Sequence, residues 1–401
     1  MSNPTPTTEA LRSKPSYPAP QKPPKWETDK LDSLLKYLKH HLQTAMLIEL
    51  YTIPMYLVSY YSITKDPDSR REQISTIFKQ EMLHLSLAGN ILCSIGGTPI
   101  TLEHAPEFPT SLFYDGVPLD LDPATKETIK VFVEVERPEW DPASLSVSDD
   151  PKIAVLPDYG SIGEFYQQVI RGITTLDDRM KKAGRELFLE PTFVKQYKGG
   201  PKSDPETDGS WHGTELTIIK NLQDATTALE LIITQGEGSS PVNGASPGDS
   251  HYHTFKSIYD KYNLEVNNVQ RNINPDDYKT EKIYVALLTA DAIYSYLLLT
   301  IEKLWQLEDR SKRRNIVTRN LHGLMGGALG PFADFLVNQR ITPESEFFAG
   351  PPFRKYDFGA KPAKDQLKDL IQKTVAAYPD EATLVDIQTK IGNLVPLEEF
   401  K

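Results

Sequence analysis

The chain has 401 residues, of which 39% are hydrophobic and 25% charged, and its formal net charge at pH 7 is -11. These values allow a sizeable core, exclude a chain that is disordered throughout, and argue against nucleic-acid binding. The single cysteine, Cys93, excludes an intrachain disulfide framework and a thiolate metal cluster.

The N-terminal residues lack the apolar core of a signal peptide and carry seven prolines before Lys25. We therefore expect residues 1–26 to form a disordered, Pro-rich arm. The most membrane-like run, residues 283–301, is interrupted by Asp291 and by hydroxyl side chains, so it predicts a buried bundle helix rather than a membrane span. The sequence predicts a cytoplasmic protein with no membrane partner.

A first helix is predicted from about residue 30 to residue 61, because apolar residues recur on one helical face. Glu49 lies within that apolar stripe, where a carboxylate without a partner would be costly. It is either a metal ligand or the partner of His40, His41 or an arginine. Pro54 should kink this helix.

A second helix is predicted between the turn at residues 66–68 and Gly96-Gly97, a pair typical of helix C-termini. Glu81 and His84 stand three positions apart and so share one face, which the flanking apolar residues turn towards the core. Glu-x-x-His on an inward face is the half-site of dinuclear carboxylate bundles, although the same pair occurs in helices that bind no metal. An antiparallel hairpin would bring Glu49 and Glu81 to one level.

Residues 98–158 are rich in proline and predict an irregular excursion with a short helix at about 126–135. Glu134 and Glu136 are expected to be surface or loop charges. Ser161 begins a third helix, in which a capping box explains Glu164 as well as metal binding would.

A fourth helix is predicted at about 222–235, followed by Glu237 between two glycines. A fifth helix begins near Ser250 and carries His251 and His253. The last third predicts helices at about 280–307 and 312–339, the second one bent at its glycines, then a helix at 363–376 and a polar tail. Neither a Walker loop nor a dinucleotide fingerprint is present in the sequence.

Six short motifs occur in a fixed order: ELYTIP (49–54), EMLHL (81–85), IGEFY (162–166), QGEG (235–238), SHY (250–252) and AGP (349–351). Together they resemble the ferritin-like family of iminophenyl-pyruvate dimer synthase, named for enzymes of bisindole pigment biosynthesis. The similarity spans about residues 30–355.

The resemblance implies a mainly α, ferritin-like helical bundle with additional C-terminal helices and long irregular loop insertions. With the residue pattern of the two ends, the chain is expected to divide into a disordered Pro-rich arm at 1–26, a ferritin-like metal-binding domain with accessory helices at 27–355, and a C-terminal helix and tail at 356–401. Carried over motif by motif, it also implies a set of metal ligands: Glu49, Glu81, His84, Glu164, Glu237 and His251.

Carboxylate and imidazole ligands suit iron, in a dinuclear or mononuclear site, and manganese or zinc would also fit. The usual Glu-x-x-His of the fourth helix is missing, since Ile233 follows Glu230 at that spacing. The second histidine must then come from the segment at 250–253, by resemblance His251 rather than His253, with Glu230 as a reserve ligand.

The function implied is a non-haem iron or manganese oxidase or oxygenase of secondary metabolism, which uses dioxygen and a small, amino-acid-derived substrate. The alternative is a ferritin-like protein that binds metal or serves as a scaffold without turnover. A hydrolase that uses metal-bound water ranks last.

Overall fold

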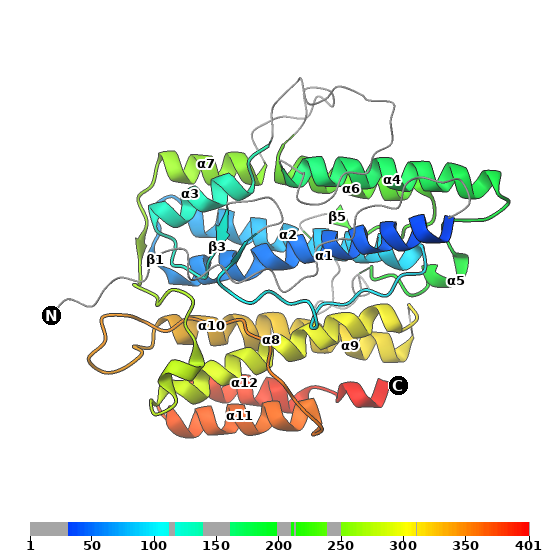
Figure 1. Ribbon diagram of the computed structural model, residues 1–401. Coiled ribbons are helices and arrows are strands. Elements are labelled where there is room, and N and C mark those ends of the chain that lie inside the picture. Colours follow the sequence, from blue (N-terminus) through cyan, green and yellow to red (C-terminus); the bar gives the residue numbers. More distant parts are fainter. Residues whose placement is uncertain are drawn as a thin grey trace.

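The structure is a computed structural model that describes residues 31–111, 117–138, 161–198, 210–211, 214–238, 250–309 and 311–400. Within these ranges the chain is mainly α-helical, as the sequence predicts (Figure 1). The arm predicted at residues 1–26 lies outside the described residues.

The helices are named here in chain order with their bounds. They are α1 (Leu31–Ser62), α2 (Arg70–Ser94), α3 (Lys126–Val135), α4 (Ile162–Lys182), α5 (Glu190–Phe193), α6 (Leu222–Gly236), α7 (His251–Asp260), α8 (Ile283–Gln306), α9 (Lys312–Leu324), α10 (Gly330–Val337), α11 (Ala363–Ala377) and α12 (Ala382–Asn393). Short 3-10 turns lie at η3 (Pro275–Tyr278) and η5 (Leu397–Phe400), and a π-helical turn, η4 (Met325–Leu329), joins α9 to α10.

The strands are short and pair as three antiparallel ladders: β1 (Ile63–Lys65) with β6 (Glu265–Val266), β2 (Thr110–Ser111) with β3 (Pro118–Leu119), and β4 (Ser210–Trp211) with β5 (Thr214–Glu215).

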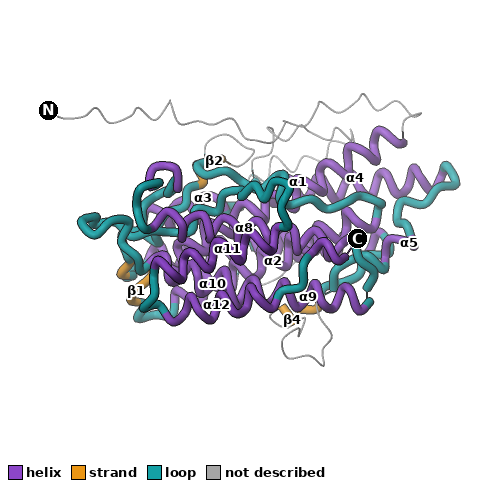
Figure 2. The backbone as a smooth tube through the Cα atoms, turned by 90° about the horizontal axis from the view of Figure 1, so that it is seen from below, coloured by secondary structure: helices purple, strands orange, loops and turns teal. Residues whose placement is uncertain are grey.

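The antiparallel hairpin of α1 and α2 lies in the middle of the molecule (Figure 1). One layer, formed by α3, α4, α6 and α7, covers one side of the hairpin. The helices α8, α9 and α10 cover the other side, and α11 and α12 pack beyond them. Figure 2 views the molecule from the side of α11 and α12, so that the layers lie one behind another. The hairpin is therefore covered on both faces.

The sandwiched position explains the burial of the hairpin. Every residue from 41 to 59 of α1 is buried, as is every residue from 83 to 95 around the C-terminal half of α2. A helix that is buried all round cannot show a clean apolar stripe, because it has no solvent face. Glu49 lies in the first of these segments and Glu81 two residues before the second, and both side chains are buried.

Local signals fix the ends of these helices. The carboxylate of Asp66 accepts hydrogen bonds from the backbone N–H groups of Arg70 and Arg71, at 2.8 and 2.7 Å, and so caps α2. At its other end, Gly96 adopts a φ of 75°, which a residue without a Cβ tolerates. The turn and the C-terminus predicted for this helix are both confirmed.

The long apolar helix α8 has the length and composition of a membrane span, but 78% of its most apolar window is buried inside the protein. Asp291, which interrupts it, is buried, and its Oδ1 accepts the backbone N–H of Arg354 at 2.8 Å. The expectation of a buried bundle helix agrees with this position.

Two details of the C-terminal third differ from the sequence prediction. The bend predicted at the glycines of 326–330 is a π-helical turn rather than a break. The polar tail expected after residue 376 is wrong, because α12 forms there and buries Leu384, Ile387 and Ile391. These three residues have helical spacing, and their contact with the rest of the C-terminal helices stabilises a segment with many polar positions. The boundary at residue 355 stays a prediction.

The closest approach of α2 to α8 depends on Gly89. A Cβ added there would lie 2.4 Å from the Trp305 ring, so we expect Gly89→Ala to overpack this contact and to cost about 1–3 kcal/mol. Gly392→Ala, in α12, is the control, because its Cβ would meet open space. Thermal unfolding should show a lower midpoint for Gly89→Ala only; equal midpoints would contradict the tight contact.

Candidate metal centre

Five buried side chains meet between the hairpin and the layer that contains α3 and α7. They form two groups of three, and within each group the ligand atoms lie within 4.8 Å of one another. One group is Glu49, Glu81 and His84; the other is Glu81, Glu136 and His251. Glu49 comes from α1, Glu81 and His84 from α2, Glu136 from the residue after α3, and His251 from the start of α7. Glu81 belongs to both groups.

The two imidazoles face the carboxylates through the same ring nitrogen. Nδ1 of His84 lies 3.4 Å from Glu49 Oε2 and 3.3 Å from Glu81 Oε2. Nδ1 of His251 lies 3.0 Å from Glu81 Oε1 and 3.6 Å from Glu136 Oε2. The rings are stacked, with centroids 5.6 Å apart. Glu81 thus presents one oxygen to each histidine.

Amide oxygens bind the outer nitrogen of each ring. Nε2 of His84 lies 2.8 Å from Gln235 Oε1, and Nε2 of His251 lies 3.0 Å from Gln80 Oε1. An amide oxygen only accepts hydrogen bonds, so each Nε2 carries a hydrogen. In a neutral ring, Nδ1 then presents its lone pair to the carboxylates.

Two tyrosines hold the outer carboxylates. The hydroxyl of Tyr166 donates a short hydrogen bond to Glu49 Oε1, and that of Tyr56 donates to Glu136 Oε1 at 2.5 Å. Both rings are fully buried. The sequence favours aromatic core packing for these tyrosines over a hydrogen bond near the site, whereas the structure gives both rings a buried position and a carboxylate partner. Partners of this kind orient ligands and tune the metal.

The charges of the cluster shift one another. Burial opposes charge on His84, yet the carboxylates of Glu49 and Glu81 raise its pKa to about 10. Burial likewise opposes charge on His251, whose pKa Glu81 and Glu136 raise to about 9. Burial and the neighbouring Glu81 raise the pKa of Glu49 to about 8. Despite burial, His251 and the other neighbours hold the pKa of Glu81 well below its ordinary value. Without a metal, protons must balance the carboxylates.

This arrangement fits a metal. Nδ1 of His251 lies 3.0 Å from Glu81 Oε1 but does not have the geometry of a hydrogen bond to any described residue. When this ring is neutral, its lone pair and the carboxylate oxygens face one another in a dry site, and a metal ion would balance them in place of the protons. The space among them is about 20 Å³, which suits small ions or water rather than an organic molecule.

The structure brings together four of the six residues predicted as ligands: Glu49, Glu81, His84 and His251. Glu237 lines the same small cavity, and its Oε1 accepts the backbone N–H of Gly163 at 2.6 Å.

Glu164 does not line the cavity. It is half-buried in the first turn of α4, where its backbone N–H donates to Ser161 Oγ at 3.0 Å, as the capping box predicts. Its role as a ligand stays a prediction. Glu230 is exposed, and Nδ1 of His253 lies 2.8 Å from Ser250 Oγ, so neither belongs to the two ligand groups.

Sequence reasoning missed Glu136. The expectation of a surface charge is wrong, because only 4% of this residue is exposed. A signal was present: Glu136 follows Ile129, Phe132 and Val133 at helical spacing, which places it on the buried face of α3. The two glutamines that hold the histidines carried no such signal.

The class of protein follows from these helices and from comparison. The family model described as Ferritin-like matches residues 42–260, and the chain belongs to this family. The matched region runs from α1 through α7 and so contains all five clustered residues.

Two relatives are informative. Dichlorochromopyrrolate synthase of Lentzea aerocolonigenes is 22% identical over 338 residues, which are 76% of this chain but only 31% of that enzyme. The chain therefore spans about a third of the length of this curated relative. A ferritin-like protein from Caulobacter vibrioides, of known crystal structure, is also 22% identical, with a TM-score of 0.50 over 72% of this chain and 93% of that one. The family resemblance and the fold predicted from the sequence are confirmed.

Glu136 and its neighbour Glu134, whose side chain is 43% exposed, offer a matched test of the cluster. Glu136→Gln removes one of the carboxylates facing His251, so we expect the metal content per chain to fall by about half if each three-ligand group holds one ion. Glu134→Gln changes only a surface pair with Arg137 and should leave the content unchanged. Elemental mass spectrometry measures both; the same content in the two variants would exclude Glu136 from the site.

Gly163 tests Glu237. A Cβ at Gly163 would lie 2.2 Å from Glu237 Oε2, so Gly163→Ala should push this flexible carboxylate aside and weaken metal binding about tenfold or more. Gly236→Ala is the control at the same site, because its Cβ would lie 3.6 Å from Glu136 Oε2, an ordinary contact. Equal metal affinities, measured by competition with a chelator, would show that Glu237 only caps α4.

Proposed function

We propose that the chain is a cytoplasmic, metal-dependent oxidase or oxygenase with a dinuclear non-haem iron or manganese centre. The observation that carries this proposal is the position of Glu81, whose two oxygens face two different histidines and which is shared by both ligand groups. A carboxylate in that position is suited to bridge two metal ions.

The residues divide naturally between two ions. Glu49 and His84 would hold one, Glu136 and His251 the other, and Glu81 would lie between them. Carboxylate oxygens with imidazole nitrogens suit iron and manganese, and zinc would also bind. Bound iron or manganese in such a set supplies redox chemistry with dioxygen. Binding also displaces the protons that otherwise balance the carboxylates.

The remaining residues prepare the site. Tyr166 and Tyr56 fix the outer carboxylates, and Gln235 and Gln80 fix the ring orientation of the histidines. Ile48, Ile232 and Ile233 line the same cavity and keep water away. Hydrogen-bonded ligands in an apolar shell hold a geometry that the metal alone would not impose.

The substrate class rests on the family. A relative named dichlorochromopyrrolate synthase supports an enzyme that acts on a small organic molecule, and we propose an amino-acid-derived metabolite of secondary metabolism as substrate, with dioxygen as oxidant. Since this chain covers a third of that enzyme, the reaction of the relative is not transferred as a whole.

One observation favours a second function. The space at the centre is only about 20 Å³, enough for an ion or a water but not for an organic substrate. A ferritin-like protein that binds metal without turnover would need no more. The two functions differ in dioxygen consumption: an oxidase consumes dioxygen repeatedly in the presence of substrate, whereas a structural site consumes at most a stoichiometric amount.

The decisive variant is Glu81→Gln, which removes the shared negative charge with little change in shape. We expect it to lose most bound metal and all repeated dioxygen consumption while its helical circular dichroism stays unchanged. Elemental mass spectrometry and an oxygen electrode measure the two effects beside Glu134→Gln as control. Full metal content in Glu81→Gln would overturn the proposed metal centre. Full metal content in the wild type without repeated dioxygen consumption would support the second function, a protein that binds metal without turnover.

A further inference from the structure

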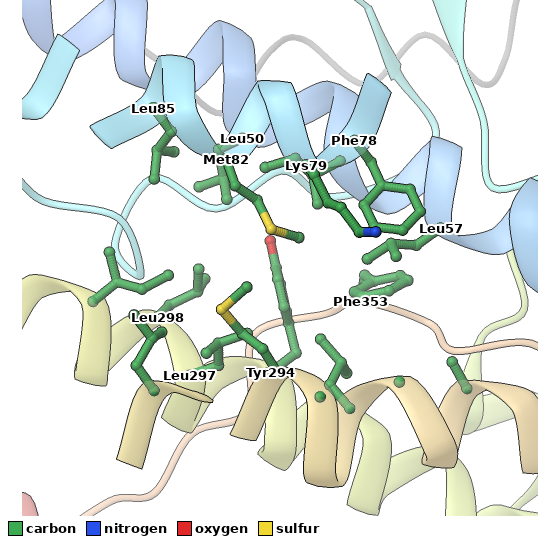
Figure 3. A pocket seen from close by; sticks show the side chains of 18 of the residues that line it. Leu50, Leu57, Phe78, Lys79, Met82, Leu85, Tyr294, Leu297, Leu298 and Phe353 are labelled. Carbon is green, nitrogen blue, oxygen red and sulfur yellow. The ribbon is translucent and has the colours of Figure 1, made fainter. Parts of the chain in front are cut away.

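A second cavity lies on the opposite side of the α1/α2 hairpin from the metal centre, between the hairpin and the layer of α8, η4 and α10 (Figure 3). Its volume is about 1020 Å³, at the upper end of the range for small-molecule sites. None of the residues that line it lines the cavity of the metal centre. It is therefore a separate compartment.

The cavity is long and mainly aliphatic. It follows one face of α2 from Ser75 to Ser86, eleven helical steps, which span about 16 Å at the rise of an α-helix. Leu50 and Leu57 line it from α1, and Leu297 and Leu298 line it from α8, as Figure 3 shows. An elongated apolar molecule fits this lining better than a compact polar one.

One polar group inside the cavity lacks a partner. The hydroxyl of Tyr294 points into the middle of the cavity between the two layers (Figure 3). The residue is only 3% exposed, and its hydroxyl has no hydrogen-bond partner among the described residues. A buried hydroxyl without a partner costs free energy, because it has lost its hydrogen bond to water. A ligand with an acceptor atom at that point would supply the missing hydrogen bond.

Positive charge lies at the exposed part of the lining. The guanidinium of Arg71 lies over the ring of Tyr60, 4.5 Å from its centroid, and 3.7 Å from Asp334 Oδ1. Lys79 is exposed and forms no ion pair within the described part of the chain, while its ammonium group reaches into the space beside Phe78. One cation therefore remains uncompensated at this end.

Trp305 lines the other end. It packs against the backbone of α2 at Gly89, and its Nε1 donates to Asn90 at 3.0 Å. A ligand that contacts Lys79 would extend from there towards Trp305. The π-helical turn η4 lines this route with Met325 and Gly326, and such turns are frequent at functional sites.

We propose that this cavity is a binding site for a long-chain aliphatic carboxylate. The carboxylate group lies between the ammonium of Lys79 and the hydroxyl of Tyr294, and the hydrocarbon chain extends along α2 towards Trp305. The site is independent of the proposed metal chemistry, because α1 and α2 separate the two cavities.

The test uses the full-length protein and dodecanoate, below its micellar concentration, in isothermal titration calorimetry. We expect about one dodecanoate per wild-type chain, as for a single cavity. Dodecanol, which has the same chain without the charge, should bind at least several-fold more weakly. No binding of dodecanoate, or equal affinity for dodecanol, would overturn the proposal.

Three variants place the ligand. Tyr294→Phe should weaken dodecanoate binding about tenfold, the value of a hydrogen bond to a charged group, yet raise the unfolding temperature of the free protein. Lys79→Ala should weaken binding several-fold and reduce its dependence on salt, whereas Lys36→Ala, on an exposed position of α1 outside the cavity, should not. Gly326→Phe should weaken binding, because Gly326 lines the cavity and a Cβ there would meet open space that a bulky ring can fill.

The metal content separates this proposal from the previous one. Gly326→Phe and Tyr294→Phe should keep the wild-type metal content, since neither residue touches the metal centre. Dodecanoate binding that keeps its wild-type affinity in both variants would place the ligand elsewhere and overturn the assignment. A lower unfolding temperature for Tyr294→Phe together with unchanged affinity would show that the tyrosine has a packing role only.

Discussion

The constraint on which this structure depends is the burial of negative charge at Glu81. This carboxylate lies in the middle of a hairpin that is covered on both sides, with Glu49 and Glu136 beside it and no water to screen them. Such a cluster is tolerated only if cations or protons balance it. The Nδ1 atoms of two histidines face it for this reason, and their outer nitrogens are fixed by amide oxygens. The positions of α3, α6 and α7 follow, because these elements or the residues next to them supply a carboxylate, a glutamine and a histidine that the hairpin lacks.

The hairpin separates two kinds of chemistry with adjacent residues. Glu49 faces the metal centre while Leu50 lines the apolar cavity, and Glu81 and Met82 divide in the same way on α2. Successive residues of a helix point about 100° apart, so a helix buried on all sides can serve two compartments at once. The polar residues of the hairpin therefore do not mark a solvent face. They are buried like its apolar residues, and those at the metal centre are turned towards it.

Much of this was predictable, and what was not has a physical reason. Helical periodicity places Glu49, Glu81 and His84 on inward faces, and the antiparallel hairpin follows from the turn and the glycines between its helices. His251 required the family resemblance, because it reaches the site from the first turn of another helix across a long loop. Glu136 was overlooked since it follows a short helix in an irregular region, although its spacing from Phe132 placed it on the buried face. The apolar cavity cannot be predicted from the sequence, because it depends on how the α1/α2 hairpin packs against the layer of α8, η4 and α10.

The gap between the α1/α2 hairpin and the layer of α8 lies next to a tight contact. Because Gly89 has no side chain, the Trp305 ring contacts the backbone of α2 there. The two layers therefore touch at this position. Towards Lys79 the layers are lined by side chains that stop short of one another, and Tyr294 reaches into the gap without finding a partner. Well-packed interiors rarely leave a void of this size, because each missing contact forfeits dispersion energy and each unpaired polar group costs more. A cavity that is retained beside a tight contact, with a donor left unsatisfied inside it, is therefore best explained by a molecule that fills it.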